Sequence, residues 1–204
     1  MHPNPNFRGP DAARNLAFAA ARGFGILAVS AETGPMLSHV PFRLTQDEAV
    51  ELHLVRSNPI LRLLQTPQPA VISVSGPDGY VSPDWYEIDD QVPTWNYVAV
   101  HLRGTLSRLD AAEMLGMLDR QTADFEARLA PKPPWLTSKL STSTLEKMLR
   151  QIVPCRLALS SVDGTWKLNQ NKPDSARHGA AANIESGGLG SDLRELSALM
   201  RDPP

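Results

Sequence analysis

Short runs of strand-forming residues follow one another along this chain, with turn signals instead of helices between them. Residues 25–30 form a compact apolar run, residues 32–34 (Glu-Thr-Gly) are a turn signal, and residues 35–42 return as the partner strand. Residues 50–54 alternate between apolar and polar side chains, as in a strand with one buried face. A doubly wound parallel sheet needs a helix between successive strands. The pattern therefore excludes that fold and favours antiparallel pairing.

Further strand-like runs continue this pattern along the chain. The additional strands are expected over residues 70–74, 94–106, 155–162 and 165–169, with turns at residues 76–79 and 163–164. About seven strands joined mostly by short hairpins suit a closed or nearly closed antiparallel barrel with helices outside it. The predicted fold class is therefore mainly β with α-helices (α+β).

Capping residues mark where helices begin. The expected helices cover residues 12–22 after Asp11, 60–65 after Asn58 and Pro59, 111–129 after Asp110, 143–152 starting at Ser143, and 191–200. A length of 204 residues predicts one domain with appendages. We expect that domain to cover residues 1–171, and residues 172–204 to be a C-terminal tail with a Gly-rich patch and a short helix.

Composition excludes several classes of function. The 20 basic and 22 acidic residues leave a net charge of −2, whereas non-specific binding of nucleic acid needs an excess of Lys and Arg. A single cysteine, Cys155, excludes an internal disulfide framework, and its apolar strand context predicts buried filler instead of a nucleophile. No run of 18 apolar residues is present, so no membrane span is expected. Residues 16–29 resemble a secretory signal, but Arg22 interrupts them, and we expect a cytoplasmic protein.

The first candidate binding segment is Arg56-Ser57-Asn58-Pro59, together with Arg62. A strand ends there and a helix begins, and the two guanidinium groups and the Ser57 hydroxyl are donors for a phosphate ester. The alternative is two solvated arginines beside an ordinary helix cap, which is the commoner meaning of so short a motif.

Two other segments combine polar groups with aromatic or basic side chains. In Trp95-Asn96-Tyr97, strand alternation puts the two rings on one face and Asn96 on the other, which suits either a planar heteroaromatic ligand or core packing. In the segment from Lys167 to Lys172, ammonium and carboxamide groups suit either a phosphate or ribityl chain or a solvated strand end.

The histidines carry no metal motif. No two of the five have the spacing that places two metal ligands on one face of a helix. His39, His53 and His101 lie on three predicted strands, so the alternative that they converge on a metal or haem stays open. The sequence also has no nucleophile elbow, no phosphate-binding loop and no dinucleotide fingerprint.

Five segments, taken in order, resemble the PaiB family of FMN-binding split-barrel proteins, which are often labelled negative transcriptional regulators. They are Ser38-His39-Val40-Pro41, His53 through Pro59, Tyr80 through Tyr86, Pro93 through Tyr97, and Lys167 through Pro173. The departures from the family pattern are Val55, the pair Ile60-Leu61, and Asn169. The resemblance spans nearly the whole chain and implies an antiparallel split β-barrel with peripheral helices.

The resemblance also implies a homodimer with FMN in the groove between subunits. Arg56, Ser57 and Asn58 would hold the FMN phosphate, joined by Arg62 or Lys167, and Ser38, His39, Val40 and Pro41 would line the isoalloxazine. Trp95, Asn96 and Tyr97 would come from the facing subunit, and Gln170 and Asn171 would close the site. No metal is expected, and no catalytic residue is assigned, although His39 is the nearest candidate for acid–base work.

The function expected from this resemblance is FMN binding, with flavin-dependent oxidoreductase activity on a small molecule or with NAD(P)H. The alternatives are a flavin-sensing regulator without turnover and a haem-binding split barrel. Direct DNA contact is not expected, because residues 111–129 carry four acidic residues against two arginines and would repel a phosphate backbone.

Overall fold

The strands close into a barrel. The computed structural model describes residues 2–9 and 11–204, and in that part of the chain seven strands follow the order β1-β2-β3-β6-β5-β4-β7. Because β1 also pairs with β4, the first six strands of this order form a closed antiparallel barrel with one additional strand, β7. The predicted fold class is confirmed.

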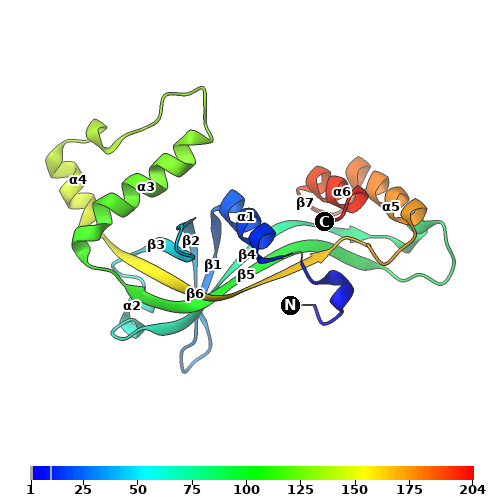
Figure 1. Cartoon of the computed structure of the whole chain (residues 1–204), viewed down its shortest axis with the longest axis horizontal. Coiled ribbons are helices and arrows are strands. Elements are labelled where there is room, and N and C mark those ends of the chain that lie inside the picture. Colours follow the sequence, from blue (N-terminus) through cyan, green and yellow to red (C-terminus); the bar gives the residue numbers. More distant parts are fainter. Residues whose placement is uncertain (1, 10) are drawn as a thin grey trace. The chain divides into compact units, whose positions relative to one another are not determined.

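The chain falls into two compact units. The barrel unit holds residues 23–73 and 102–161, and the helix-covered unit holds the described residues among 1–22, 74–101 and 162–204. The strands are β1 (Phe24–Val29), β2 (Met36–Leu44), β3 (Ala49–Val55), β4 (Gln68–Val81), β5 (Thr94–Arg108), β6 (Ile152–Lys167) and β7 (Gly190–Ser191). Three of them, β4, β5 and β6, contribute residues to both units (Figure 1).

Strand alternation fills the inside of the barrel with apolar side chains. Leu27, Val40, Leu52 and Leu157 are almost fully buried, and the register pairs Leu52 with Cys155 across β3 and β6. Gly104 lies where a Cβ would meet the backbone oxygen of Ala158 at 1.9 Å, so a residue without a side chain lets β5 and β6 approach closely there. The barrel is therefore a packed core.

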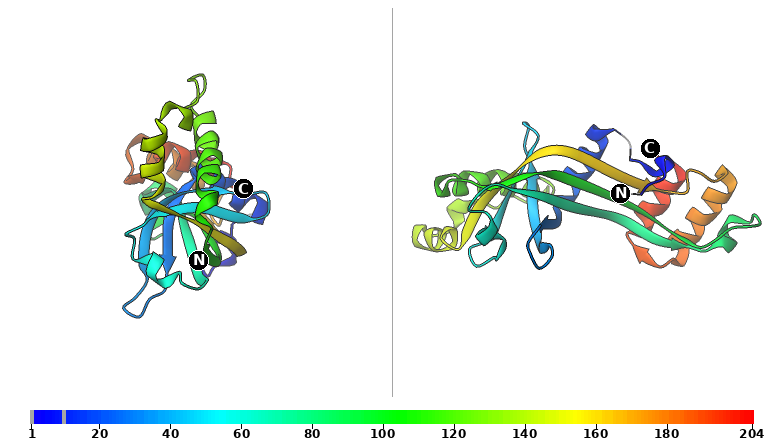
Figure 2. Two further views of the ribbon diagram at one scale, coloured as in Figure 1. Left: turned by 90° about the vertical axis from the view of Figure 1, so that its left-hand side faces the viewer. Right: turned by 90° about the horizontal axis from the view of Figure 1, so that it is seen from below.

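Two helices of the barrel unit lie outside its strands. They are α3 (Met114–Ala127), which follows the 3-10 turn η3 (Ala111–Glu113), and α4 (Thr142–Leu149), which lies near α3 in Figure 2. Arg120 of α3 donates to the buried carboxylate of Glu51 at 2.7 Å, and Arg43 of β2 reaches both Glu51 and Asp124 of α3. Burial of a charged group is costly unless the group is paired, so these ion pairs tie α3 to β2 and β3.

The helix-covered unit packs helices on strands. Its helices are α1 (Ala12–Arg22), α5 (Asp174–Gly187) and α6 (Leu193–Arg201), with short 3-10 turns η1 (Pro5–Phe7) and η2 (Pro83–Tyr86). Helices α5 and α6 lie against each other in Figures 1 and 2, and their Ala180, Ile184 and Leu196 share one core with Val98 and Trp166 of the strands. The Trp166 indole donates to Asn15 Oδ1 of α1 at 2.9 Å.

Two predicted hairpin turns are wrong. Residues 76–79 and 163–164 lie inside the uninterrupted strands β4 and β6. At Gly76 a Cβ would meet the ring of Phe18 at 2.5 Å, and at Gly164 it would meet Asn15 Oδ1 at 2.1 Å. These glycines therefore let side chains of α1 approach the strand backbone closely, and they make no turn.

The remaining helix predictions differ in detail. Helix α1 matches its predicted bounds and is capped by Asp11, whereas α4 is capped by Ser141 and not by Ser143. Helix α5 was not predicted, because most of its buried residues are small, such as Ala176 and Ala181, and Ile184 alone makes no apolar periodicity. The tail therefore holds two helices, while the domain boundary at 171/172 stays a prediction.

A turn between β3 and the short helix α2 (Ile60–Leu63) is held by one amide side chain. Asn58 Oδ1 accepts from the backbone N–H of Ile60 at 3.0 Å, but the helix begins at Ile60 with Pro59 as its N-cap residue, so the predicted cap at Asn58 is wrong by one position. Asn58 Nδ2 donates to Ser38 Oγ on β2, also at 3.0 Å. One side chain thus fixes the turn after β3 to the neighbouring strand.

Asn58 can be tested by two substitutions at one position. Asn58→Ala removes both hydrogen bonds and should lower the free energy of unfolding by about 1–2 kcal/mol. Asn58→Asp keeps the acceptor for Ile60, and the Ser38 hydroxyl can donate to the second carboxylate oxygen, so most of the stability should remain. Denaturant unfolding of the three proteins measures this; equal losses in both variants would contradict the assigned hydrogen bonds.

Candidate functional site

The four β2 residues expected near a flavin ring lie on two faces of the strand. Val40 is 2 % exposed and belongs to the barrel core. Ser38 points to the same side and bonds Asn58, whereas His39 is exposed and its ring stacks on that of Phe24 with centroids 6.3 Å apart. Pro41 is half-buried. Contact with a ligand is therefore open to Ser38, His39 and Pro41, but not to the Val40 side chain.

The turn after β3 presents basic side chains. Arg56 Nε donates to the backbone oxygen of Arg150 at 2.7 Å, and its Nη2 donates to that of Ile152 at 3.3 Å. These bonds use two of the five guanidinium N–H groups and hold the side chain in one orientation. Ser57 and Arg62 are exposed, and no carboxylate occurs in residues 55–62. This donor set fits a phosphate monoester.

In the helix-covered unit, the segment from Trp95 to Tyr97 alternates as predicted. Trp95 is 47 % exposed and makes an edge contact with Tyr80, while Asn96 is fully buried. Asn96 Nδ2 donates to the Met200 sulfur at 3.4 Å, and its Oδ1 has no hydrogen-bond partner within the described residues. The aromatic face is available to a ligand, whereas Asn96 faces the core.

Among the polar residues at the end of β6, Gln170 bonds with its side chain to nearby backbone groups. Gln170 Oε1 accepts from the Leu168 N–H at 2.8 Å, and Gln170 Nε2 donates to the Trp166 oxygen at 2.6 Å. Lys167 Nζ donates to Thr94 Oγ1, and burial lowers the pKa of this ammonium group. Asn171 is exposed. A ligand role for Gln170 or Lys167 stays a prediction, because both side chains already have partners.

The partly buried His53 and the buried Cys155 offer little chemistry. Burial lowers the pKa of His53, whose Nδ1 has no hydrogen-bond partner among the described residues. Across residues 2–9 and 11–204, no three His, Cys, Asp or Glu side chains gather in a way that could hold a metal ion. Cys155 is fully buried, and burial raises the pKa of its thiol to about 12. The prediction that Cys155 is buried filler is confirmed.

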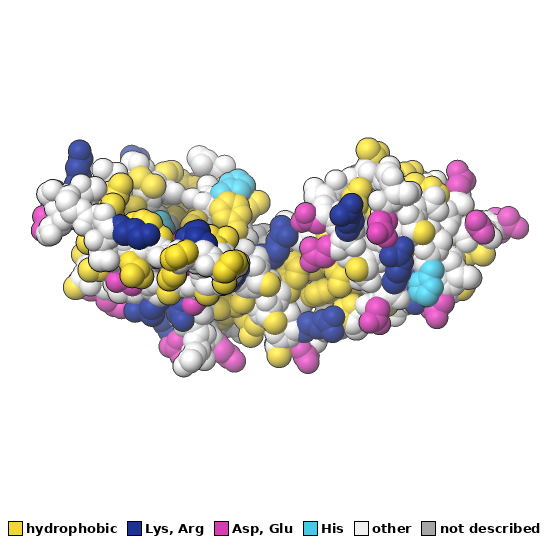
Figure 3. Space-filling model, turned by 90° about the horizontal axis from the view of Figure 1, so that it is seen from above, with side chains coloured by type: hydrophobic (Ala, Val, Ile, Leu, Met, Phe, Trp, Pro, Cys, Tyr) yellow, Lys and Arg dark blue, Asp and Glu magenta, His cyan; other side chains and the backbone are white. Residues whose placement is uncertain are grey.

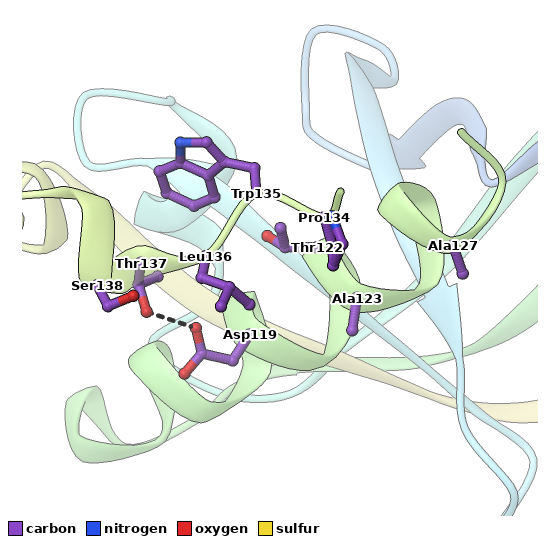
Figure 4. A pocket seen from close by; sticks show the side chains of 9 residues that line it. All are labelled: Asp119, Thr122, Ala123, Ala127, Pro134, Trp135, Leu136, Thr137 and Ser138. Atoms are coloured by element: carbon purple, nitrogen blue, oxygen red, sulfur yellow. Dashed lines mark hydrogen bonds between the residues drawn. The ribbon is translucent and has the colours of Figure 1, made fainter. Parts of the chain in front are cut away.

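Two pockets of the barrel unit were not predicted. One, of about 460 Å³, lies between α3 and residues 134–138, where Thr137 donates to Asp119 at 3.1 Å (Figure 4). Its lining holds small and apolar side chains, the carboxylate of Asp119 and no basic group, so it does not suit a phosphate. The other, of about 360 Å³, brings Arg108 and Arg150 to the same cavity as Arg56. No local pattern links these three arginines, because they come from segments far apart in the sequence.

The surface shows charges of both signs. On the face drawn in Figure 3, acidic and basic side chains are intermingled over α5 and α6. Among the described helices, none has both the length and the apolar character that crossing a membrane requires.

Comparisons with known proteins identify the family to which this chain is similar. Residues 1–161 match the family described as "Putative FMN-binding domain". "Protease synthase and sporulation protein PAI 2" of Bacillus subtilis is 26% identical over 188 residues, which cover 91% of this chain and 89% of that protein. An uncharacterised protein of Saccharomyces cerevisiae, YKL070W, is 31% identical over 52% of this chain and 69% of its own length.

Solved structures agree on the fold. A FAD- and heme-binding protein from Mycobacterium smegmatis is similar with a TM-score of 0.58 and 21% identity, covering 90% of this chain and 81% of that one. The flavocytochrome Anf3 from Azotobacter vinelandii has the same TM-score with 16% identity, covering 81% and 72%. At such identities the likeness concerns the fold alone. By the family match, which covers most of its length, the chain belongs to the FMN-binding family, and this confirms both the resemblance to PaiB proteins and the prediction of FMN as cofactor.

Proposed function

We propose that the barrel unit seats the FMN phosphate at the turn after β3, and that the bound flavin exchanges electrons with NAD(P)H, which makes the protein an oxidoreductase. The observation that carries the phosphate seat is the turn itself. Arg56, Ser57 and Arg62 supply two positive charges and a hydroxyl with no carboxylate among them, and Asn58 holds the turn to β2.

The charges favour a phosphate over other groups. A phosphate monoester carries about −1.5 to −2 charges at neutral pH, which two guanidinium groups balance. Arg56 reaches two backbone oxygens and keeps three N–H groups for a ligand, so little side-chain freedom is lost when an anion binds. Arg62 is exposed and can move to meet the phosphate.

The ring system would lie along β2, next to the turn. When bound, FMN supplies a two-electron acceptor that takes hydride from a reduced nicotinamide. The chain supplies orientation there: Ser38 is fixed by Asn58, and Pro41 has a partly exposed apolar ring. His39, stacked on Phe24, is the exposed side chain of this strand that can hold or release a proton.

The phosphate seat predicts the effect of removing each arginine. Arg62→Ala and Arg56→Ala should each weaken FMN binding by about 1.5–3 kcal/mol, roughly a 10- to 150-fold rise in Kd, because a charge-assisted hydrogen bond is lost. Titration of the apo protein with FMN, followed by flavin fluorescence, measures this. Arg194→Ala on α6 is the matched control and should bind FMN as the unaltered chain does. Unchanged affinity in both site variants would place the phosphate elsewhere.

The redox role has its own measurement. Anaerobic addition of NADH or NADPH to the FMN-loaded protein should bleach the flavin absorption near ~450 nm at a rate fast enough for catalytic turnover. A flavin that binds but stays oxidised would contradict the oxidoreductase and favour a flavin-sensing protein without turnover. A band near ~400 nm in the purified protein would instead indicate haem.

We propose further that a second copy of this chain covers the outer face of β1, β2 and β4. Leu37 is 61 % exposed and Phe24 53 % exposed, and the register sets Ala28 between Leu37 on β2 and Val71 on β4. Contiguous apolar side chains on a sheet face mark an association surface. Two identical faces can cover each other about a two-fold axis, which is how most homodimers form.

If a second copy covers the outer face of β1, β2 and β4, a charge placed on that face should change the mass of the protein in solution. Leu37→Lys should shift the protein from twice the chain mass towards the monomer, because a charge would have to be buried between the copies. Light scattering after size exclusion gives the mass. Val92→Lys, at a side chain 73 % exposed in the other unit, should leave the mass unchanged. A monomeric unaltered protein at micromolar concentration would refute this interface.

A further inference from the structure

Three arginines from separate elements border the 360 Å³ pocket of the barrel unit. Arg56 follows β3, Arg108 ends β5, and Arg150 follows α4. The remaining walls are apolar and include Met114, Leu149 and Ile152, and no acidic residue lines the pocket. Basic side chains around an apolar cavity are the chemistry that recognises an organic anion.

Two of the three guanidinium groups are held in place by backbone oxygens. Arg56 donates to the oxygens of Arg150 and Ile152, and Arg108 Nη2 donates to the oxygen of Leu61. Each keeps N–H groups that these bonds do not use. Their positions are therefore set before any ligand arrives, which reduces the entropy lost on binding.

The neighbouring acidic groups do not neutralise the pocket. Asp110 Oδ1 accepts from the backbone N–H of Ala112 at 2.8 Å. Glu146 lies 3.9 Å from Arg150 Nη1, and both side chains are mostly exposed, so this pair is weak. Three like charges around one cavity repel one another, and an anion between them relieves that repulsion.

We propose that this pocket binds a small organic anion, a phosphate ester or carboxylate on an apolar body, at a site separate from the flavin. Arg108 would meet the anionic group, Arg150 would swing onto it, and Met114 and Leu149 would contact the apolar body, whereas Arg56 borders the pocket but serves the proposed flavin phosphate. The site does not depend on FMN, because Arg108, Arg150 and the apolar walls take no part in the proposed flavin seat.

Phenyl phosphate is a suitable probe, and calorimetric titration of the full chain saturated with FMN is the test. Saturable binding is expected, weaker by about tenfold in Arg150→Gln, because one charge-assisted contact is lost. Lys147→Gln removes a charge of the same sign from an exposed side chain of α4, close to Arg150 in the sequence, but Lys147 does not line the pocket, so this variant should bind the probe normally. Inorganic phosphate, which lacks the apolar body, should bind more weakly than phenyl phosphate.

The outcomes separate this site from the flavin seat. If FMN abolishes binding that the apo protein shows, the probe occupies the flavin phosphate seat and the second site is refuted. No binding in either form, or equal weakening in both variants, also overturns it. If the protein fails to bind FMN but the apo form binds phenyl phosphate with dependence on Arg150, the flavin seat fails and this site stands.

Discussion

The pairing of β1 with β4 is the contact on which the barrel depends. Residues Ile26–Val29 pair with β2 on one edge and with Ala70–Ser73 of β4 on the other, so β1 leaves no free edge along these residues. Closure turns the apolar faces of six strands inward and makes one core from short strands that could not bury their faces alone. It also fixes β2 beside the end of β3, where Asn58 reaches Ser38.

The chemistry of the barrel unit depends on whether each charged side chain is paired with an opposite charge or with a neutral group. The buried carboxylate of Glu51 is matched by Arg120 and Arg43, and that pairing ties α3 to the strands. The guanidinium groups of Arg56 and Arg108 are held by neutral backbone oxygens instead, so their charge is not cancelled. Ordered cations whose charge is not cancelled are suited to anions, and the proposed flavin phosphate seat and the proposed anion pocket both depend on this property.

Local patterns predicted much of the fold. Alternation and turn residues predicted β1, β2 and β3, and the cap at Asp11 is where it was expected. The two wrong hairpin turns concern glycine, because a glycine can serve a turn or a close approach, and local sequence does not distinguish them. Gly76 and Gly164 accommodate Phe18 and Asn15, which belong to a helix many residues away.

The sequence by itself determined the fold class, because strand alternation and capping residues are properties of neighbouring residues. Its ordered motifs carry the resemblance that implied the family and its cofactor. Only the tertiary structure decided what the polar side chains do. It turned Gln170 onto its own backbone, buried Asn96, and brought Arg108 and Arg150 to the cavity that Arg56 borders. Hydrogen bonding and burial depend on contacts between distant segments, and those contacts exist only once the barrel has closed.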